Sequence, residues 1–198
     1  MKRRLAVVLW AMVLGLSICV TGAQAQKPTE GIGQWLSQVG VFTGYIEGDV
    51  KYLDDLQAVP VGMRFGFDLK PFTRKFNFDP KGMLEIIYEP YIAGILTPEQ
   101  NAEFGLPFFF RYSFPLTEKF HPYLEVGTGP YYMTLGTYEQ STQFNFVSAG
   151  GAGLTYFFKE NWALSVGYRM RHVSNASIDK PNGGREANVY TAGGADYF

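Results

Sequence analysis

The sequence predicts an all-β fold: an eight-stranded antiparallel transmembrane β-barrel of the bacterial outer membrane. Three observations predict it. The chain starts with a secretory signal, eight later segments alternate apolar with polar or small residues, and no apolar run after the signal approaches the roughly 20 residues of a spanning helix. An exported protein that enters a membrane without such helices must cross it with strands that close into a barrel.

The first 25 residues have the three parts of a signal peptide. Lys2, Arg3 and Arg4 form a basic start, residues 5–20 are apolar, and "AQA" at 23–25 is a small-residue cleavage site. We therefore expect a signal peptide at 1–25 and a single barrel domain at 26–198. The only cysteine, Cys19, lies in the signal, so the exported chain is expected to lack disulfides. The stretch "GIGQWLSQ" before the first strand predicts no particular element.

Eight segments are candidate strands, and most are longer than the roughly 5 to 6 residues usual in soluble sheets. Lengths of about 9 to 11 residues suit tilted membrane strands. The expected strands are 39–47, 59–69, 82–95, 102–114, 120–133, 143–158, 161–175 and 186–198.

Alternation is clearest in the second, fourth and seventh segments. In "VGMRFGFDL", "EFGLPFFFRYSF" and "NWALSVGYRMRHVSN", large apolar residues share one face and small or charged residues mostly share the other. A soluble sandwich would show the same period. The polar faces, however, carry charges of both signs that could pair inside a lumen: Arg64, Glu85, Glu89, Arg111, Glu125 and Arg169. This favours a membrane barrel with a filled, salt-bridged interior.

An even number of strands places both ends of the chain on the periplasmic side of the barrel. The connections near 48–58, 96–101, 134–142 and 176–185 are then expected outside the cell. Those near 70–81, 115–119 and 159–160 are expected on the periplasmic side.

The composition argues against several partners. A formal net charge of -1 for the whole chain, which includes the basic residues of the signal, gives no general reason to expect nucleic acid. His121 has no cysteine or clustered second histidine beside it, so we predict a rim residue and no metal or other cofactor.

The stretch "RHVSNASIDKPNGGRE", residues 171–186, holds the residue types of a nucleophile, its base and an orienting acid. His172 and Ser174 have the same parity as the outward apolar row, so both are expected to face lipid. Glu186 begins the next strand, and which of the two it faces depends on a register that the sequence leaves open. Asp179 could compete as the acid. Lys180 and Arg185 could contact phosphates, although charges in an external loop usually need no such role.

This stretch resembles the signature of the PagL family of outer-membrane lipid A 3-O-deacylases, in which R-H-x-S-N is followed by P-N-x-G and a glutamate. The matching residues are Arg171, His172, Ser174, Asn175, Pro181, Asn182, Gly184 and Glu186. Ser177 stands where we expect a glycine.

The resemblance implies an esterase that removes an ester-linked 3-hydroxyacyl chain, at position 3, from the lipid A of lipopolysaccharide in the outer leaflet. It assigns Ser174 as nucleophile, His172 as general base and Glu186 as the acid that orients the base. Asn175 is the candidate for stabilising the oxyanion, by side chain or backbone N–H. The implied partners are lipopolysaccharide and outer-membrane lipid, and a homodimer remains open.

Two alternatives stay beside this reading. One is a non-catalytic barrel with a structural or adhesive role, for which Ser174 would be replaceable. The other is a barrel acyltransferase or phospholipase that uses the same residues on another lipid.

Overall fold

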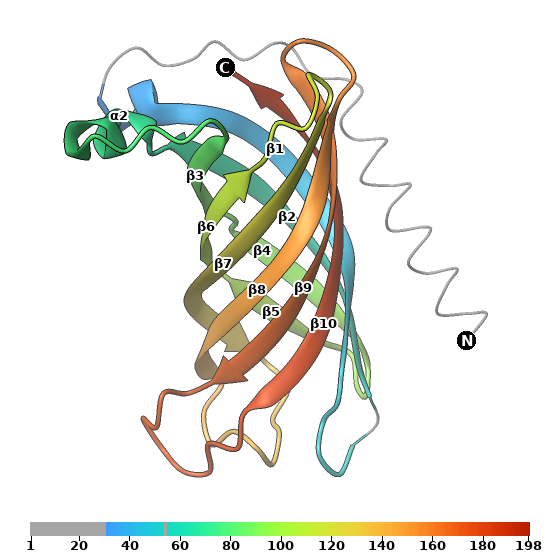
Figure 1. The fold of residues 1–198 in the computed structure, drawn as a ribbon. Coiled ribbons are helices and arrows are strands. Elements are labelled where there is room, and N and C mark those ends of the chain that lie inside the picture. The colour runs from blue at the N-terminus through green and yellow to red at the C-terminus, as the bar shows by residue number, and fades with distance from the viewer. Residues whose placement is uncertain (1–30, 54) are drawn as a thin grey trace.

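The computed structural model describes residues 31–53 and 55–198, which form a closed antiparallel barrel (Figure 1). The expected signal peptide and Cys19 lie outside the described residues. A 3-10 turn at Gly31–Trp35 (η2) leads into the barrel. The strands are β1 (Leu36–Gly48), β2 (Leu56–Asp68), β3 (Met83–Tyr88), β4 (Tyr91–Thr97), β5 (Asn101–Gly105), β6 (Phe108–Ser113), β7 (Phe120–Met133), β8 (Phe144–Phe157), β9 (Trp162–Ser174) and β10 (Arg185–Tyr197).

Ten strand segments make eight spanning strands, because two spans are interrupted. β3 and β4 both pair with β2, and β5 and β6 both pair with β7. Pro90 and Pro107 stand in the two gaps, where a residue without an N–H cannot donate to the ladder. Their carbonyls still accept hydrogen bonds from neighbouring strands, at 3.1 Å from Met63 N and 3.0 Å from Glu89 N. β10 pairs with β1 and closes the barrel, which confirms the predicted fold class.

The predicted alternation is also confirmed. On β9, Val166 and Met170 point outward, with 51% and 64% of their surfaces exposed, whereas Arg169 and Arg171 are buried. The same division holds on β6, where Phe108 and Phe110 are exposed and Arg111 is buried. The exposed apolar belt is the surface that lipid would cover.

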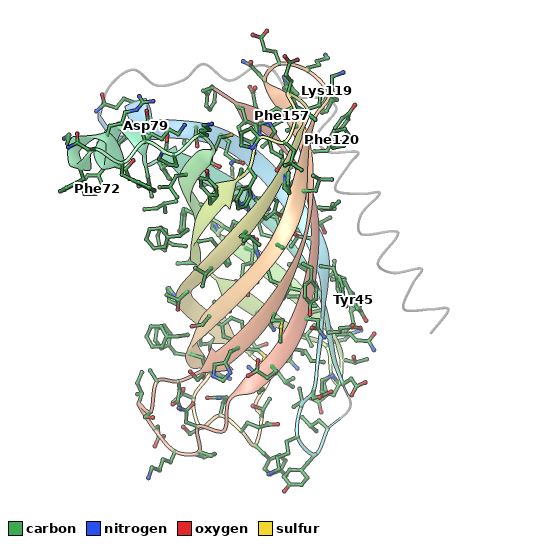
Figure 2. All side chains as sticks on the ribbon, in the orientation of Figure 1. Tyr45, Phe72, Asp79, Lys119, Phe120 and Phe157 are labelled. Atoms are coloured by element: carbon green, nitrogen blue, oxygen red, sulfur yellow. The ribbon has the colours of Figure 1, made fainter. Side chains whose placement is uncertain are left out.

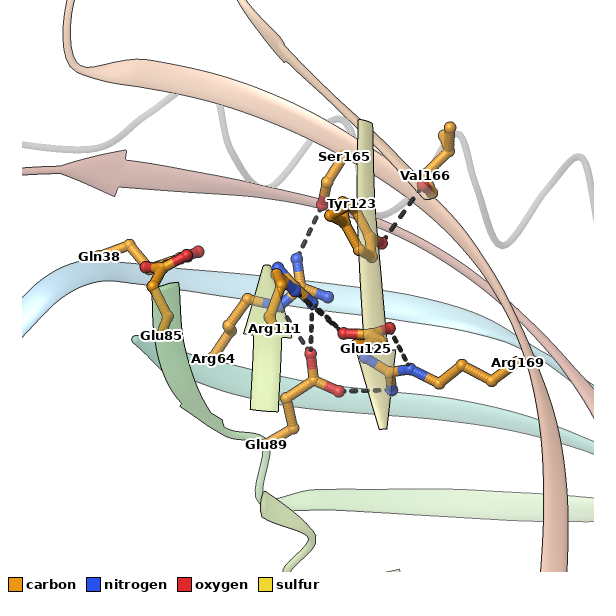
Figure 3. A network of polar contacts seen from close by, with 10 residues as sticks. All are labelled: Gln38, Arg64, Glu85, Glu89, Arg111, Tyr123, Glu125, Ser165, Val166 and Arg169. Atoms are coloured by element: carbon orange, nitrogen blue, oxygen red, sulfur yellow. Dashed lines mark hydrogen bonds and ion pairs between the residues drawn. The ribbon is translucent and has the colours of Figure 1, made fainter. Parts of the chain in front are cut away.

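The middle of the lumen is filled by a network of paired charges (Figure 3). Arg169 donates to Glu89 and to Glu125, both at 2.6 Å. Arg64 donates to Glu89 at 2.7 Å, and Arg111 donates to Glu125 at 2.7 Å. Buried charges are tolerated when they are paired and hydrogen-bonded, so the network supports the predicted salt-bridged interior.

Glu85, which we expected to join that network, binds two polar side chains instead. It accepts hydrogen bonds from Ser37 at 2.5 Å and Gln38 at 2.9 Å. A second buried pair lies beyond the central network, where Arg171 Nη1 donates to Glu103 Oε1 at 2.7 Å.

The two ends of the barrel differ (Figure 1). We call one end the terminal end. It carries the start of β1, the end of β10 and a short helical segment made of α2 (Lys70–Thr73) and η3 (Arg74–Phe76). Figure 2 shows Phe72, Asp79, Lys119 and Phe157 at this end. We call the opposite end the loop end, and it carries the β1–β2, β7–β8 and β9–β10 loops. Within the described residues, no helix is long and apolar enough to cross a membrane.

Candidate active site at the loop end

His172 and Glu186 form a close pair on the outer face of the barrel. The register between β9 and β10 places Glu186 directly opposite His172. The Nδ1 of His172 lies 2.6 Å from Oε1 of Glu186, with 47% and 72% of the two side chains exposed. If Nδ1 carries the proton and donates to the carboxylate, Nε2 is left as a free acceptor. The pair therefore has the arrangement of a general base with its orienting acid.

Ser174 lies two residues beyond His172 on the same face. β9 pairs with both neighbours through this stretch without a register shift, so no bulge reverses the parity. Ser174 is partly exposed at the last position of β9. In the part of the chain that the structure describes, no hydrogen bond joins its hydroxyl to His172. Catalytic hydrogen bonds are often long before substrate binds, so the placement is compatible with a nucleophile.

A second serine lies beside His172, and sequence reasoning missed it. Ser148 on β8 is the direct cross-strand partner of His172, whereas Ser174 is paired with Phe146. Directly opposed residues have Cβ atoms about 4.5 to 5.5 Å apart. The Ser148 hydroxyl contacts Thr128 Oγ1 at 3.1 Å. Only the β8–β9 register reveals this neighbour, and nothing in the local pattern of β8 indicates it.

Gly184 holds the imidazole from the loop side. Its φ of +72° lies in the left-handed region, and a Cβ built there would be 2.6 Å from Cε1 of His172. A side chain at this position would be strained and would also displace the ring. The glycine of the motif is thus a packing requirement of the His172 site.

Asn175, the predicted oxyanion residue, is fully buried and organises the β9–β10 loop, residues 175–184. Its backbone N–H donates to Asn182 Oδ1 at 2.9 Å, and its Nδ2 donates to the Asp179 carbonyl at 2.9 Å. Both groups considered for the oxyanion are therefore engaged within the loop. At position 177, where we expected a glycine, Ser177 has a φ of +62°. This angle lies in the left-handed region that glycine adopts without strain.

The remaining candidates lie apart from this pair. The Asp179 carboxylate accepts a hydrogen bond from the backbone N–H of Lys180 at 2.8 Å and makes no contact with His172 in the described chain. Arg185 was expected in the external loop, but it is the first residue of β10 and only 6% exposed. His121 packs against Phe157 near the terminal end. Among the described residues, no group of three or more His, Cys, Asp or Glu could hold a metal ion.

A cavity of about 350 Å³ opens beside Glu186. Met170 and Asn188 line it from the same outward row, and Glu47 lines it from β1. Space therefore exists next to the acid at the surface of the barrel.

Comparison with known proteins identifies the same family that the motif at 171–186 resembles. The family model described as "Lipid A 3-O-deacylase (PagL)" matches residues 57–193 of this chain. A search of curated proteins finds no match.

Two solved structures share the fold. The outer membrane enzyme PagL is 21% identical, with a TM-score of 0.60 over 79% of this chain and 98% of that one. Neisserial surface protein A is 14% identical, with a TM-score of 0.58 over 81% of this chain and 96% of that one. At these identities the two structures are evidence for the barrel fold alone.

Proposed function

Because this chain belongs to the PagL family of lipid A 3-O-deacylases, a family of outer-membrane ester hydrolases, we propose that it cleaves its substrate with Ser174, His172 and Glu186. The bond we propose is the ester that links a 3-hydroxyacyl chain to position 3 of lipid A. The observation that carries the proposal is the 2.6 Å contact between His172 Nδ1 and Glu186 Oε1.

In the first half of the reaction, Ser174 Oγ attacks the ester carbonyl while His172 Nε2 takes its proton. The tetrahedral intermediate collapses, the bond to the sugar oxygen breaks, and the imidazolium returns the proton to that oxygen. Glu186 keeps Nε2 free for both transfers and stabilises the imidazolium. The product left on the enzyme is an acyl ester of Ser174.

In the second half, His172 removes a proton from water, and the resulting nucleophile attacks the acyl ester. The fatty acid leaves and Ser174 recovers its proton from the imidazolium. Because His172, Ser174 and Glu186 lie on the outer face at the loop end, they meet the acyl esters of a lipid directly if that end lies outside the cell.

We also propose Asn175 for the oxyanion. This role requires the β9–β10 loop to release either the backbone N–H from Asn182 or the amide from Asp179 when substrate binds. Its support is the position of Asn175 next to Ser174. A small decrease in kcat for Asn175→Ala, with an increase in KM, would exclude the side-chain amide from this role and leave the backbone N–H, which the variant keeps.

The test is mass spectrometry of lipid A from cells that produce each variant. Ser174→Ala and His172→Ala should leave a folded, heat-modifiable barrel and reduce deacylation to background. Ser148→Ala is the matched control, because it removes a hydroxyl beside the same imidazole and should retain activity. If the Ser148 variant loses activity and the Ser174 variant keeps it, the nucleophile is Ser148 on β8 and not Ser174.

The lipid A spectra, together with spectra of phospholipid from the same cells, test the alternative of a barrel phospholipase or acyltransferase. Such an enzyme would leave the 3-hydroxyacyl chain on lipid A and would change the phospholipids or add an acyl chain to an acceptor instead.

A further inference from the structure

A second cavity, of about 400 Å³, lies at the loop end and is separate from the His172 site. β7, β8 and β10 contribute Met133, Asn145 and Arg185 to it, and the β7–β8 loop, residues 134–143, contributes the rest of its lining. None of the described residues that line it is an Asp or Glu. We call it the loop-end cavity.

Among the described residues of this lining, Arg185 is the only one with a charged side chain, and it is 6% exposed. Of the buried arginines in the described chain, Arg64, Arg111, Arg169 and Arg171 each have a carboxylate oxygen within 2.7 Å. Arg185 has none there, and its one hydrogen bond goes from Nη1 to the sulfur of Met133 at 3.3 Å. Glu103 lies within electrostatic range of Arg185, but its oxygens are already bound by Arg171 and Tyr131. Arg185 therefore has no carboxylate in direct contact, and an anion that enters the cavity and binds it would be favoured.

The unused atoms of Arg185 have the geometry for an oxyanion. Its Nε and Nη2 have no hydrogen-bond partner among the described residues. These two atoms form one edge of the guanidinium fork, and Arg111 uses the same edge to bind Glu125, at 3.0 and 2.7 Å. An edge of this kind matches two oxygens of a phosphate or carboxylate.

Three residues that line the cavity also carry unused acceptor oxygens, which the protein encloses before a ligand binds. Within residues 31–53 and 55–198, the side-chain carbonyls of Asn145 and Gln140, 1% and 7% exposed, have no donor, and the Thr137 hydroxyl has no partner. An ionised phosphate or carboxylate cannot donate to these oxygens, whereas sugar hydroxyls can. The two sets of unused groups together fit a sugar that bears an anionic group.

We propose that the loop-end cavity binds an anionic sugar, one that carries a phosphate or carboxylate, with the anion on Arg185 and sugar hydroxyls on Asn145 and Gln140. The ligand is either the headgroup of lipopolysaccharide or a free sugar of the same chemistry. The site is linked to the proposed active site, because Ser141 of its lining accepts a hydrogen bond from Asn175 at 3.2 Å.

Calorimetric titration of the refolded barrel in detergent tests the proposal, with glucose 6-phosphate and glucuronate as probes and neutral glucose as the comparison. At least one anionic sugar should bind saturably and more tightly than glucose. Arg185→Gln should weaken that binding about 10- to 100-fold, as expected for loss of charge-assisted hydrogen bonds. Lys180→Gln removes an exposed charge from the neighbouring loop and should change nothing. No saturable binding, or equal binding by wild type and the Arg185 variant, overturns the proposal.

A second variant covers the case in which Arg185→Gln does not fold. A Cβ at Gly136, which lines the cavity, meets no atom within 4 Å, so Gly136→Leu adds bulk without a backbone clash. It should weaken binding of the anionic sugar, and unchanged affinity would count against the site. Displacement of the bound sugar by lipopolysaccharide identifies a lipid headgroup as the natural source, and its absence identifies a free solute. Because the probes contain no acyl ester, the result does not depend on the proposed deacylation.

Discussion

Replacing Glu186 by glutamine tests the proposed mechanism at its most specific contact. The substitution keeps the shape of the side chain and removes the charge 2.6 Å from His172 Nδ1. Glutamine offers a donor as well as an acceptor. If its amide N–H donates to Nδ1, the ring proton moves to Nε2, and the imidazole can no longer accept the proton of Ser174.

The geometry of the pair sets the expected size of the effect. Locking the wrong tautomer in a serine hydrolase costs on the order of 10⁴ in turnover, about 5.5 kcal/mol. Here the two side chains are 47% and 72% exposed, so the glutamine can also rotate away and leave the ring free. In that case only a charge-assisted hydrogen bond is lost, worth about 1.5 to 3 kcal/mol or roughly 10- to 150-fold. We therefore expect kcat to fall by about 10- to 10⁴-fold, with the larger loss if the glutamine holds the wrong tautomer.

The assay is release of hydroxy fatty acid from lipopolysaccharide by purified, refolded barrels in detergent. Glu47→Gln is the matched control: it removes a carboxylate that lines the same cavity but does not contact His172. Asp179→Asn is the second control, because that carboxylate binds the backbone of Lys180. Both controls should stay within a fewfold of wild type. Activity kept in the Glu186 variant and lost in the Asp179 variant would refute the assignment of the acid.

Three further predictions use other parts of the structure. Gly184→Ala should lower activity far more than stability, because its Cβ would lie 2.6 Å from the imidazole, whereas Gly183→Ala, with its nearest atom at 3.5 Å, should be tolerated; deacylation rates and urea unfolding of both variants check this. Glu103→Gln should destabilise the barrel by about 3 to 5 kcal/mol, because it leaves Arg171 buried without its partner; urea unfolding measures the loss, and a cost below about 1 kcal/mol, the value typical of exposed pairs, would contradict it. A protease-sensitive tag in the loop at 176–183 should be cleaved on intact cells, and cleavage only after permeabilisation would invert the orientation.

Much of the barrel could be predicted from the sequence because a strand has a local period of two. Alternation alone places Met170, His172 and Ser174 on one face and Arg169 and Arg171 on the other, and the structure agrees. The ends of the strands are less predictable, because they depend on pairing. The first strand starts at Leu36, three residues before the expected position, since its early residues pair with β2 and with the end of β10.

The candidate site depends both on local sequence pattern and on how the strands pair. Residue types, parity and the motif select His172, Ser174 and Glu186, and each of these is a property of one short segment. The partner of Glu186 and the nearness of Ser148 are matters of register between strands, which the length and shape of the connecting loops decide. The roles of Asn175 and Arg185 depend on their burial in the folded barrel. Asn175 and Arg185 appear in the sequence as ordinary polar residues at a loop. Only the closed barrel makes the first the buried centre of that loop and the second a buried cation with two N–H groups that have no partner among the described residues.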